Sequence, residues 1–281
     1  MKKIAFLFLT IDNPNFTNIW DYYFKGNEDK INIYIHPKNP DNITWHPECI
    51  IKNLKPTAWG FIVAAYISLF KTALKNKDNY KFITISESCV PIKPFNEMYN
   101  DLIKNKKESY IKIFPITNYD FGDRITSDVK KNIDKDKLIK HYARMCLSRY
   151  HIKKILHNLD KIKLFINMHV GDEFFLSSIT PLNNYKDIAI THDDWEYVFK
   201  IVKDIRKEIK KLYDEQESNN KINNNDKIIE LQNKYQNIAK NPKTIIKVSK
   251  DDLENMKNTK SYFYRKFHKD SDIEKYIYDF I

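Results

Sequence analysis

The chain is poor in glycine, with four residues in 281. Phosphate-binding loops of the Walker and Rossmann types need several glycines at fixed spacing, because their backbones approach the phosphates closely. Both types of loop are therefore excluded. Cysteine is scarce as well: three residues at scattered spacing indicate neither a disulfide framework nor a zinc site of the CxxC type.

Long apolar runs are also missing. The apolar start of the chain, residues 4–11, is too short to span a membrane and lacks the cleavage pattern of a signal peptide. We expect it to form a buried first strand, and we expect no membrane span. Together with the cysteine usage, this favours a soluble, cytoplasmic protein in a reducing compartment.

Positive charge predominates: the chain contains 48 Lys and Arg residues and 37 Asp and Glu residues, which gives a net charge of +11. This excess fits a basic nucleic-acid-binding protein without catalysis, and it also fits a protein that binds anionic ligands such as nucleotide sugars. Lys, Asn, Ile and Tyr abound together, as AT-rich codons would produce, so we expect most lysines to be solvated surface. No zinc-finger or RNA-binding aromatic pattern is present.

Strand-like and helix-like segments alternate in the first half of the chain, which is typical of an α/β fold. Continuous apolar runs predict buried strands, and apolar residues at three- and four-residue steps predict amphipathic helices. The predicted strands are residues 4–10, 31–36, 81–86, 109–114 and 141–147, and the predicted helices are residues 16–24, 59–75, 94–105, 148–159 and 174–179. We expect one domain over residues 1–281, with a mixed, mostly parallel central sheet flanked by helices.

Residues 196–240 differ in character from the rest. Apolar side chains at helical spacing run from Val198 to Leu212, polar residues 219–226 interrupt them, and the spacing resumes from Ile228 to Ile238. This predicts a helical hairpin inserted into the domain. Packing on its own domain is the favoured arrangement, and a homodimer through the hairpin is the alternative.

An acidic pair, Asp172-Glu173, follows Gly171 and precedes the apolar run 174–179. We expect a carboxylate at the N-terminal end of a helix, where the helix dipole and free N–H groups keep it ionised. An ionised carboxylate at a fixed position is what a general base requires. Near the C-terminus, aromatic residues enclose the basic pair Arg265-Lys266. A base and a paired cation together indicate transfer chemistry on a phosphorylated donor.

Two further polar segments are candidate binding sites. Glu87 and Ser88 follow the predicted strand 81–86, and the carboxyl ends of strands are where open α/β sheets bind ligands. Asp194 and Trp195 place a carboxylate beside an indole, a combination that can stack a sugar ring and bond its hydroxyls. The structural alternatives are a turn after the strand and a core tryptophan that anchors the following helix.

One cluster of residues has metal-ligand chemistry, namely His169, Asp172, Glu173, His192, Asp193 and Asp194, and the ligands of the alternative site are His169, Asp172, His192 and Asp193. They allow a zinc or dinuclear site, so a metal-dependent hydrolase is an alternative function. Their spacing matches no ligand set that metal geometry demands, and capping and solvation account for such residues as well.

Taken in order, the motifs of the chain resemble those of the core-2/I-branching glycosyltransferases (glycosyltransferase family 14), and the plant-type branch in particular. The resemblance extends over more than half of the chain, and its most specific parts are residues 85–92, DEFF and RKF. The segments that carry it are FLFLT (6–10), WDYYFKG (20–26), IYIHPK (33–38), ISESCVPI (85–92), HVGDEFFLSSI (169–179), ITHDDW (190–195) and YFYRKF (262–267).

The resemblance implies a GT-A-type fold, a UDP-sugar donor, inverting transfer to a glycan hydroxyl and no divalent metal. By motif position, Glu173 corresponds to the catalytic base, and Arg265 and Lys266 correspond to the basic segment that neutralises the leaving diphosphate. Thr10 and His36 are the candidate nucleotide contacts, and Asp172 is a candidate contact of the sugar or the acceptor, together with Glu87, Ser88, Asp194 and Trp195. UDP-GlcNAc is the first candidate donor, and UDP-xylose and UDP-glucuronate are alternatives.

The chain departs from the family pattern at several positions. Golgi members carry a membrane anchor and disulfides, which are not found here, and many members have His-Val-Asp where this chain has His36-Pro37-Lys38. The tryptophan usual before the middle helix is replaced within residues 141–149, and the hairpin separates Trp195 from residues 241–242. The missing anchor and the AT-rich composition suggest a large DNA virus or an AT-rich microbe; for a virus, the compartment is the host cytoplasm.

Overall fold

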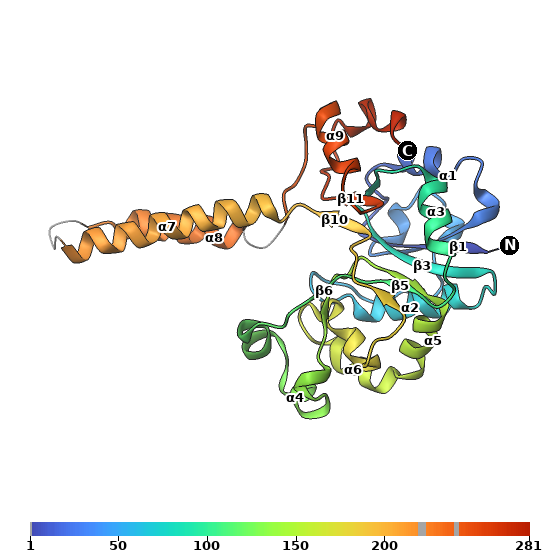
Figure 1. The fold of residues 1–281 in the computed structure, drawn as a ribbon, viewed down its shortest axis with the longest axis horizontal. Coiled ribbons are helices and arrows are strands. Elements are labelled where there is room, and N and C mark those ends of the chain that lie inside the picture. The colour runs from blue at the N-terminus through green and yellow to red at the C-terminus, as the bar shows by residue number, and fades with distance from the viewer. Residues whose placement is uncertain (1, 219–222, 239–241) are drawn as a thin grey trace.

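The fold is built on a six-stranded sheet with the strand order β2-β1-β3-β8-β5-β9 (Figure 1). This computed structural model describes residues 2–218, 223–238 and 242–281. Strands β1, β2 and β3 are parallel, and β8 is antiparallel to both of its neighbours. The six strands are β1 (Lys3–Thr10), β2 (Ile31–Pro37), β3 (Asn79–Ser86), β5 (Ser109–Tyr110), β8 (Cys146–Ser148) and β9 (Tyr185–Lys186). The predicted mixed, mostly parallel sheet is confirmed.

Helices cover both faces of this sheet, because β1 is apolar on both. Ala5 and Leu7 belong to a core shared with α2, α5 and α6, whereas Phe6 and Phe8 belong to a second core shared with α1 and α3. Successive side chains of a strand point to opposite faces, so a continuous apolar run fills two cores at once. The helices are α1 (Thr17–Phe24), α2 (Val63–Leu74), α3 (Phe95–Ile103), α4 (Ser127–Asn132), α5 (Arg149–His157), α6 (Leu159–Ile166), α7 (Glu196–Ser218), α8 (Asn225–Ile238) and α9 (Lys250–Lys257).

A second, three-stranded sheet joins segments that lie far apart in the chain. It consists of β4 (Val90–Pro91), β10 (Thr191–Asp193) and β11 (Phe263–Arg265), with β11 in the middle. Strands β10 and β11 are parallel, and their register places Asp193 opposite Arg265. A two-stranded sheet of β6 (Ile113–Phe114) and β7 (Lys140–His141) lies beside the main sheet.

Several predicted elements differ from those observed. The predicted strands 109–114 and 141–147 are each split in two, and the predicted helix 174–179 is a 3₁₀ helix, Phe175–Ile179. The predicted helix 59–75 begins only at Val63, because Gly60 has a φ of +79° and forms a turn before it. Helices α4, α6 and α9 were not predicted.

The predicted hairpin is present as α7 and α8, which project away from the body of the molecule (Figure 1). The expectation that it packs on its own domain is wrong, because the two helices bury their apolar stripes against each other. Ile205, Leu212, Ile228 and Leu231 form a small core of their own, separate from the cores around the sheet. Residues 219–222 and 239–240 of the predicted hairpin lie outside the described residues. The homodimer stays a prediction.

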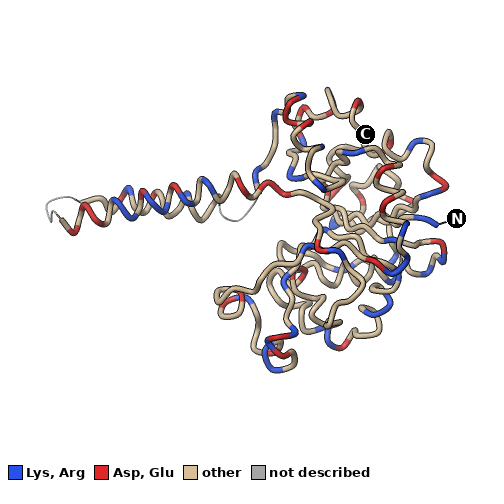
Figure 2. The backbone as a smooth tube through the Cα atoms, viewed as in Figure 1, with Lys and Arg blue, Asp and Glu red and all other residues tan. Residues whose placement is uncertain are grey.

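Charge is spread over the whole molecule. Figure 2 shows Lys and Arg interspersed with Asp and Glu along the hairpin and over the body. Among the described residues, no helix combines the length and the apolar character needed to cross a membrane.

Candidate active site

The carboxyl ends of β1 and β3 lie side by side, and the loops that follow them are joined there. The Glu87 carboxylate accepts a hydrogen bond from the Ile11 N–H (2.8 Å), and the Glu87 carbonyl accepts one from the Asn15 N–H (2.9 Å). Strand β1 has β2 on one side and β3 on the other, so the direction of winding changes at this point. Open α/β sheets bind ligands at such switch points, which agrees with the predicted position of Glu87.

The two predicted nucleotide contacts have different environments. Thr10 ends β1, and its buried hydroxyl has no hydrogen-bond partner within the described part of the chain. His36 is fully buried, and its Nε2 accepts a hydrogen bond from the Lys55 N–H (2.9 Å). Burial lowers the pKa of His36, so the ring supports the backbone at Lys55 as a neutral acceptor. Contact of either residue with a nucleotide stays a prediction.

Asp193 binds two arginines at once. Its Oδ2 lies 3.1 Å from Arg144 Nη2 and 3.0 Å from Arg265 Nη1, and its side chain is fully buried. Burial opposes the charge of Arg144, but the Asp193 carboxylate raises its pKa, so the guanidinium stays charged. One carboxylate therefore pairs with two guanidinium groups, and this group of three side chains keeps a net positive charge. The Nε atoms of both arginines are buried and have no partner among the described residues, which leaves donors for an anionic ligand.

The acidic pair lies on a 3₁₀ turn, Gly171–Glu173. Glycine is required there, because a Cβ on Gly171 would lie 2.1 Å from the Phe165 carbonyl oxygen. This close approach fixes the position of the two carboxylates that follow.

The pair does not lie at the start of an α-helix as expected, because the turn Gly171–Glu173 is followed by a second 3₁₀ helix, Phe175–Ile179. Burial raises the pKa of Asp172, against the attraction of Arg144 and Arg265. Burial and the neighbouring Asp172 raise the pKa of Glu173 as well. Burial is the largest influence on both carboxyl groups, and for Asp172 it outweighs a backbone hydrogen bond that favours the charged form. A raised pKa still suits a general base, which works best when its pKa lies near the operating pH.

Glu173 faces a small network of cations. Its Oε2 lies 3.6 Å from Arg124 Nη1, and Arg124 in turn lies 3.9 Å from the buried Asp120. Lys140 binds the same Asp120 oxygen at 2.7 Å, and its charge partly opposes the rise in the pKa of Glu173. The glutamate is thus held at its place while about a third of its side chain stays exposed to an incoming group.

Electrostatic interactions join the acidic pair to the two basic segments. Arg144 acts on both Asp172 and Glu173, and Arg265 acts on Asp172. Burial and the charge of Arg265 lower the pKa of Lys266, which also interacts with Glu87. Residues predicted from four separate motifs are therefore brought into one site. The peptide bond between Arg265 and Lys266 is cis.

The four residues of the predicted alternative metal centre are not assembled. The His169 ring packs against Trp59 (4.9 Å between centroids), and the His192 ring packs against Tyr264 (4.8 Å). Asp193 is occupied by two arginines. In the part of the chain that the structure describes, no three of these side chains place their ligand atoms together. The hydrolase site proposed from this cluster is therefore wrong.

The remaining predicted binding residues make internal contacts. The Asp194 carboxylate accepts a hydrogen bond from the Tyr197 N–H (3.3 Å) at the start of α7, and Trp195 stacks on Phe199 with centroids 6.0 Å apart. Ser88 is buried, and its carbonyl accepts a hydrogen bond from the Phe267 N–H (3.1 Å). Their roles toward a sugar or an acceptor stay predictions.

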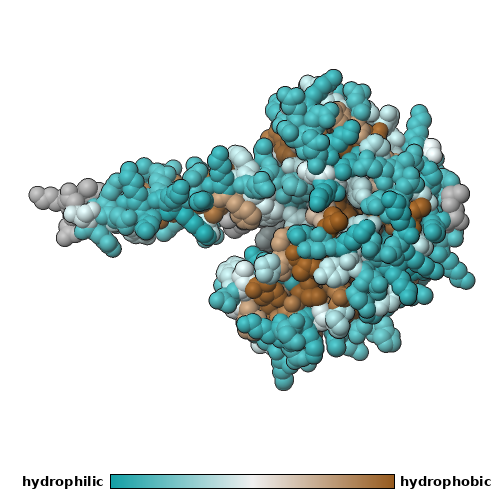
Figure 3. Space-filling model, viewed as in Figure 1, coloured by the Kyte–Doolittle hydropathy of each residue, from teal (hydrophilic) through white to brown (hydrophobic). Residues whose placement is uncertain are grey.

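An open apolar pocket lies on the side of β6 and β7. It is lined by residues 113–116 and by residues of the segment 135–139. Figure 3 shows hydrophobic side chains gathered on the body beneath the projecting hairpin. Lys140, which acts on Glu173, directly follows this segment.

Arg144 is the main site residue that was missed from the sequence. A signal was present, because Arg144 is a single cation within a run of otherwise buried residues, Ala143 to Ser148. A cation in such a run needs a buried partner, but the run itself does not reveal which one.

Comparison with known proteins agrees with this fold and site. Residues 4–198 match the family described as Branch, Core-2/I-Branching enzyme. The fold and the matched region thus define an enzyme of the α/β class with a GT-A-like sheet. The chain belongs to the Core-2/I-Branching enzyme family, and the predicted resemblance to that family is confirmed.

The chain is also similar to glycosyltransferase BC10 of Oryza sativa subsp. japonica, with 28% identity over 125 residues, which make up 41% of this chain and 31% of that protein. The chain therefore spans about a third of the length of this curated relative. The family match contains Glu173 and Arg144 and ends before Arg265 and Lys266.

Proposed function

We propose that the protein is an inverting, metal-independent glycosyltransferase. It moves a sugar, GlcNAc in the first instance, from a UDP-sugar to a hydroxyl of a glycan acceptor. The observation that carries the proposal is the electrostatic link between Glu173 and Arg144, which shares the Asp193 carboxylate with Arg265. A carboxylate with a raised pKa beside buried, permanently charged donors is the arrangement that base-assisted displacement of a diphosphate requires.

The chemical step is a single displacement. The Glu173 carboxylate takes the proton of the acceptor hydroxyl while that oxygen forms a bond to the anomeric carbon of the sugar. The bond from this carbon to the diphosphate oxygen breaks, and UDP leaves with its electron pair. Because the hydroxyl attacks opposite the leaving group, the anomeric configuration is inverted.

Protein cations neutralise the leaving diphosphate in this proposal. Arg265 and Lys266 come from β11 and the residue that follows it, and Arg144 adds a third cation from the main sheet side. Arginine keeps its charge at every physiological pH, and donors that are already in position stabilise a developing anion by several kcal/mol. These three cations can therefore perform the task that a divalent metal performs in other transferases.

The test is a transfer assay with UDP-GlcNAc, UDP-xylose and UDP-glucuronate, combined with thermal-shift measurements with UDP, each with and without EDTA. We expect UDP to raise the unfolding temperature and EDTA to leave transfer intact. Replacement of Arg265 and Lys266 by alanine should abolish turnover, whereas Lys269→Ala, an exposed lysine nearby, should not. Loss of transfer with EDTA, or a normal rate in the double variant, would contradict the proposal.

The compartment is part of the proposal. All three cysteines are free, and Cys89 and Cys146 are buried, which supports a reducing environment such as the cytoplasm.

A further inference from the structure

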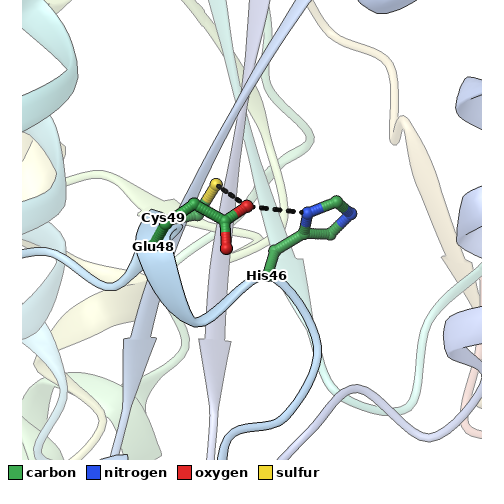
Figure 4. A group of neighbouring side chains, drawn as sticks. All are labelled: His46, Glu48 and Cys49. Carbon is green, nitrogen blue, oxygen red and sulfur yellow. Dashed lines mark hydrogen bonds and ion pairs between the residues drawn. The ribbon is translucent and has the colours of Figure 1, made fainter.

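Three potential metal ligands lie together on the connection between β2 and α2, apart from the residues of the candidate active site. Figure 4 shows His46, Glu48 and Cys49 with their polar atoms facing one another. Glu48 Oε1 lies 3.0 Å from His46 Nδ1 and 3.7 Å from Cys49 Sγ. One ligand atom of each residue lies within 4.8 Å of the other two, so a small ion can reach all three after minor side-chain adjustment.

The backbone explains why these residues converge. His46 has a φ of 46°, in the left-handed region that few non-glycine residues adopt, and it leads into the 3₁₀ turn Pro47–Cys49. This reversal brings His46 back over Glu48 and Cys49. The preceding Trp45 is buried against Phe8 of β1, with ring centroids 5.2 Å apart, so the turn is attached to the main core.

A carboxylate outside the cluster orients the histidine. His46 Nε2 lies 3.6 Å from Asp21 Oδ1, and the Trp45 indole N–H donates to the same Asp21 oxygen at 2.8 Å. In metal-binding histidines, the ring nitrogen that does not bind the metal usually donates a hydrogen bond to a carboxylate, which fixes the orientation and the tautomer of the ring. With Nε2 directed at Asp21, the nitrogen left for a ligand is Nδ1, which faces Glu48 and Cys49. The contacts of Asp21 with His46 and Trp45 are a second observation, separate from the mutual contacts of the three potential ligands.

We propose that His46, Glu48 and Cys49 form a binding site for a borderline divalent metal ion, Zn²⁺ in particular. Zn²⁺ accepts thiolate, imidazole and carboxylate ligands together, whereas Mg²⁺ and Ca²⁺ require oxygen ligands. Three protein ligands leave one position of a tetrahedral ion for water, and the side chains of His46 and Glu48 are 37% and 68% exposed, so water can reach it. On binding, the Cys49 thiol gives its proton to solvent and a metal–sulfur bond forms, without any change of oxidation state.

The site goes beyond the proposed transferase reaction, because none of its ligands takes part in that reaction. Its effect is structural: a bound ion would tie the 46–49 turn to Asp21 of α1 through His46. A His46→Ala variant separates a stabilising effect of zinc from a catalytic need for a metal. Zinc should no longer raise its unfolding temperature, whereas its transfer rate should equal that of the wild type.

The experiment uses Co²⁺ as a spectroscopic substitute for Zn²⁺ on the full chain. We expect a near-ultraviolet thiolate-to-cobalt band in the wild-type protein and its displacement by Zn²⁺. Cys49→Ser should abolish the band, and Asp21→Asn should weaken metal affinity by about 10–100-fold. His268→Ala serves as the matched control, because His268 is a half-exposed histidine 3.3 Å from a carboxylate of Asp270; it should leave the band unchanged.

Two outcomes would overturn the proposal: a wild-type protein that shows no thiolate band, or a band that persists in Cys49→Ser. Folding is checked for each variant by circular dichroism without metal. If Cys49→Ser does not fold, the Co²⁺ affinity of Glu48→Gln is measured instead, because this exposed side chain can be replaced without loss of core packing. An unchanged Co²⁺ affinity in Glu48→Gln would then refute the site.

Discussion

Replacement of Glu173 by glutamine is the sharpest test of the proposed base. The change keeps the size of the side chain and removes its charge. Loss of a general base lowers a rate by about 10²–10⁴-fold, which corresponds to about 3–5 kcal/mol of activation free energy. We therefore expect transfer to fall by this factor while UDP still raises the unfolding temperature.

The same substitution should have little effect on folding. The ion pair between Glu173 and Arg124 is about a third exposed on both sides, and such pairs contribute at most about 1 kcal/mol to the free energy of unfolding. Because burial and Asp172 raise the pKa of Glu173, the fold disfavours its charged form at neutral pH. The glutamine variant should therefore unfold at the same temperature as the wild type or slightly above it.

The pH dependence of the wild-type enzyme follows from the same raised pKa. Transfer needs the deprotonated carboxylate. The value of kcat/KM should therefore reach its maximum above the pKa of Glu173 and fall as the pH decreases through that pKa. This limb should lie above 4.5, the ordinary value for glutamate. Initial rates measured across acidic and neutral pH at low substrate concentration give the profile.

Glu108→Gln is the matched control for this test. Glu108 forms an ion pair with Lys186 at 3.0 Å on the far edge of the sheet, and its replacement should not affect transfer. The reasoning is refuted if Glu173→Gln transfers sugar at the wild-type rate with an unchanged acidic limb.

Three further predictions follow from the packing. Asp193→Asn leaves two largely buried guanidinium groups without their shared carboxylate and should lower the free energy of unfolding by about 3–5 kcal/mol; a urea midpoint equal to that of the wild type would argue against the pair. Gly171→Ala should lower the unfolding temperature and slow transfer, whereas Gly122→Ala, with nothing within 4 Å of its Cβ, should do neither. Equal unfolding temperatures and transfer rates of the two variants would mean that the turn can accommodate a Cβ at residue 171. A chain in which a short Gly/Ser linker replaces α7 and α8 should keep the UDP-induced thermal shift, and light scattering will tell whether a homodimer depends on the hairpin; an unfolded product would contradict the separate packing of these helices.

Much of the sheet was predictable because local patterns determine it. Strand β1 is apolar on both faces, and only a strand between two layers of helices needs such a run. The apolar run 174–179 was harder, since a short apolar segment suits an α-helix, a 3₁₀ helix or a strand. The close contact of Gly171 with Phe165, which shapes the turn before this run, is a tertiary feature that no local pattern contains.

The site was predictable only in part. Its motifs predicted Glu173, Arg265 and Glu87 as site residues. The partner of Arg144 lies 49 residues away in the sequence, so that pairing appears only after folding. The direction of the Glu173 pKa shift was also beyond reach, because it depends on how deeply the fold buries the carboxylate. Asp193, interpreted as a metal ligand, is instead the counter-ion of two arginines.

The hairpin leaves and re-enters the body at a single residue. The Asp194 side chain accepts a hydrogen bond from the first turn of α7, and the Asp194 carbonyl accepts one from the Lys243 N–H (3.1 Å) just after the described part of α8. Both ends of the excursion are therefore tied to one point, and the pairing of β10 with β11 on either side does not depend on its length. The length or sequence of this arm can therefore change during evolution without disturbing the ion pairs that Asp193, one residue earlier, makes with Arg144 and Arg265.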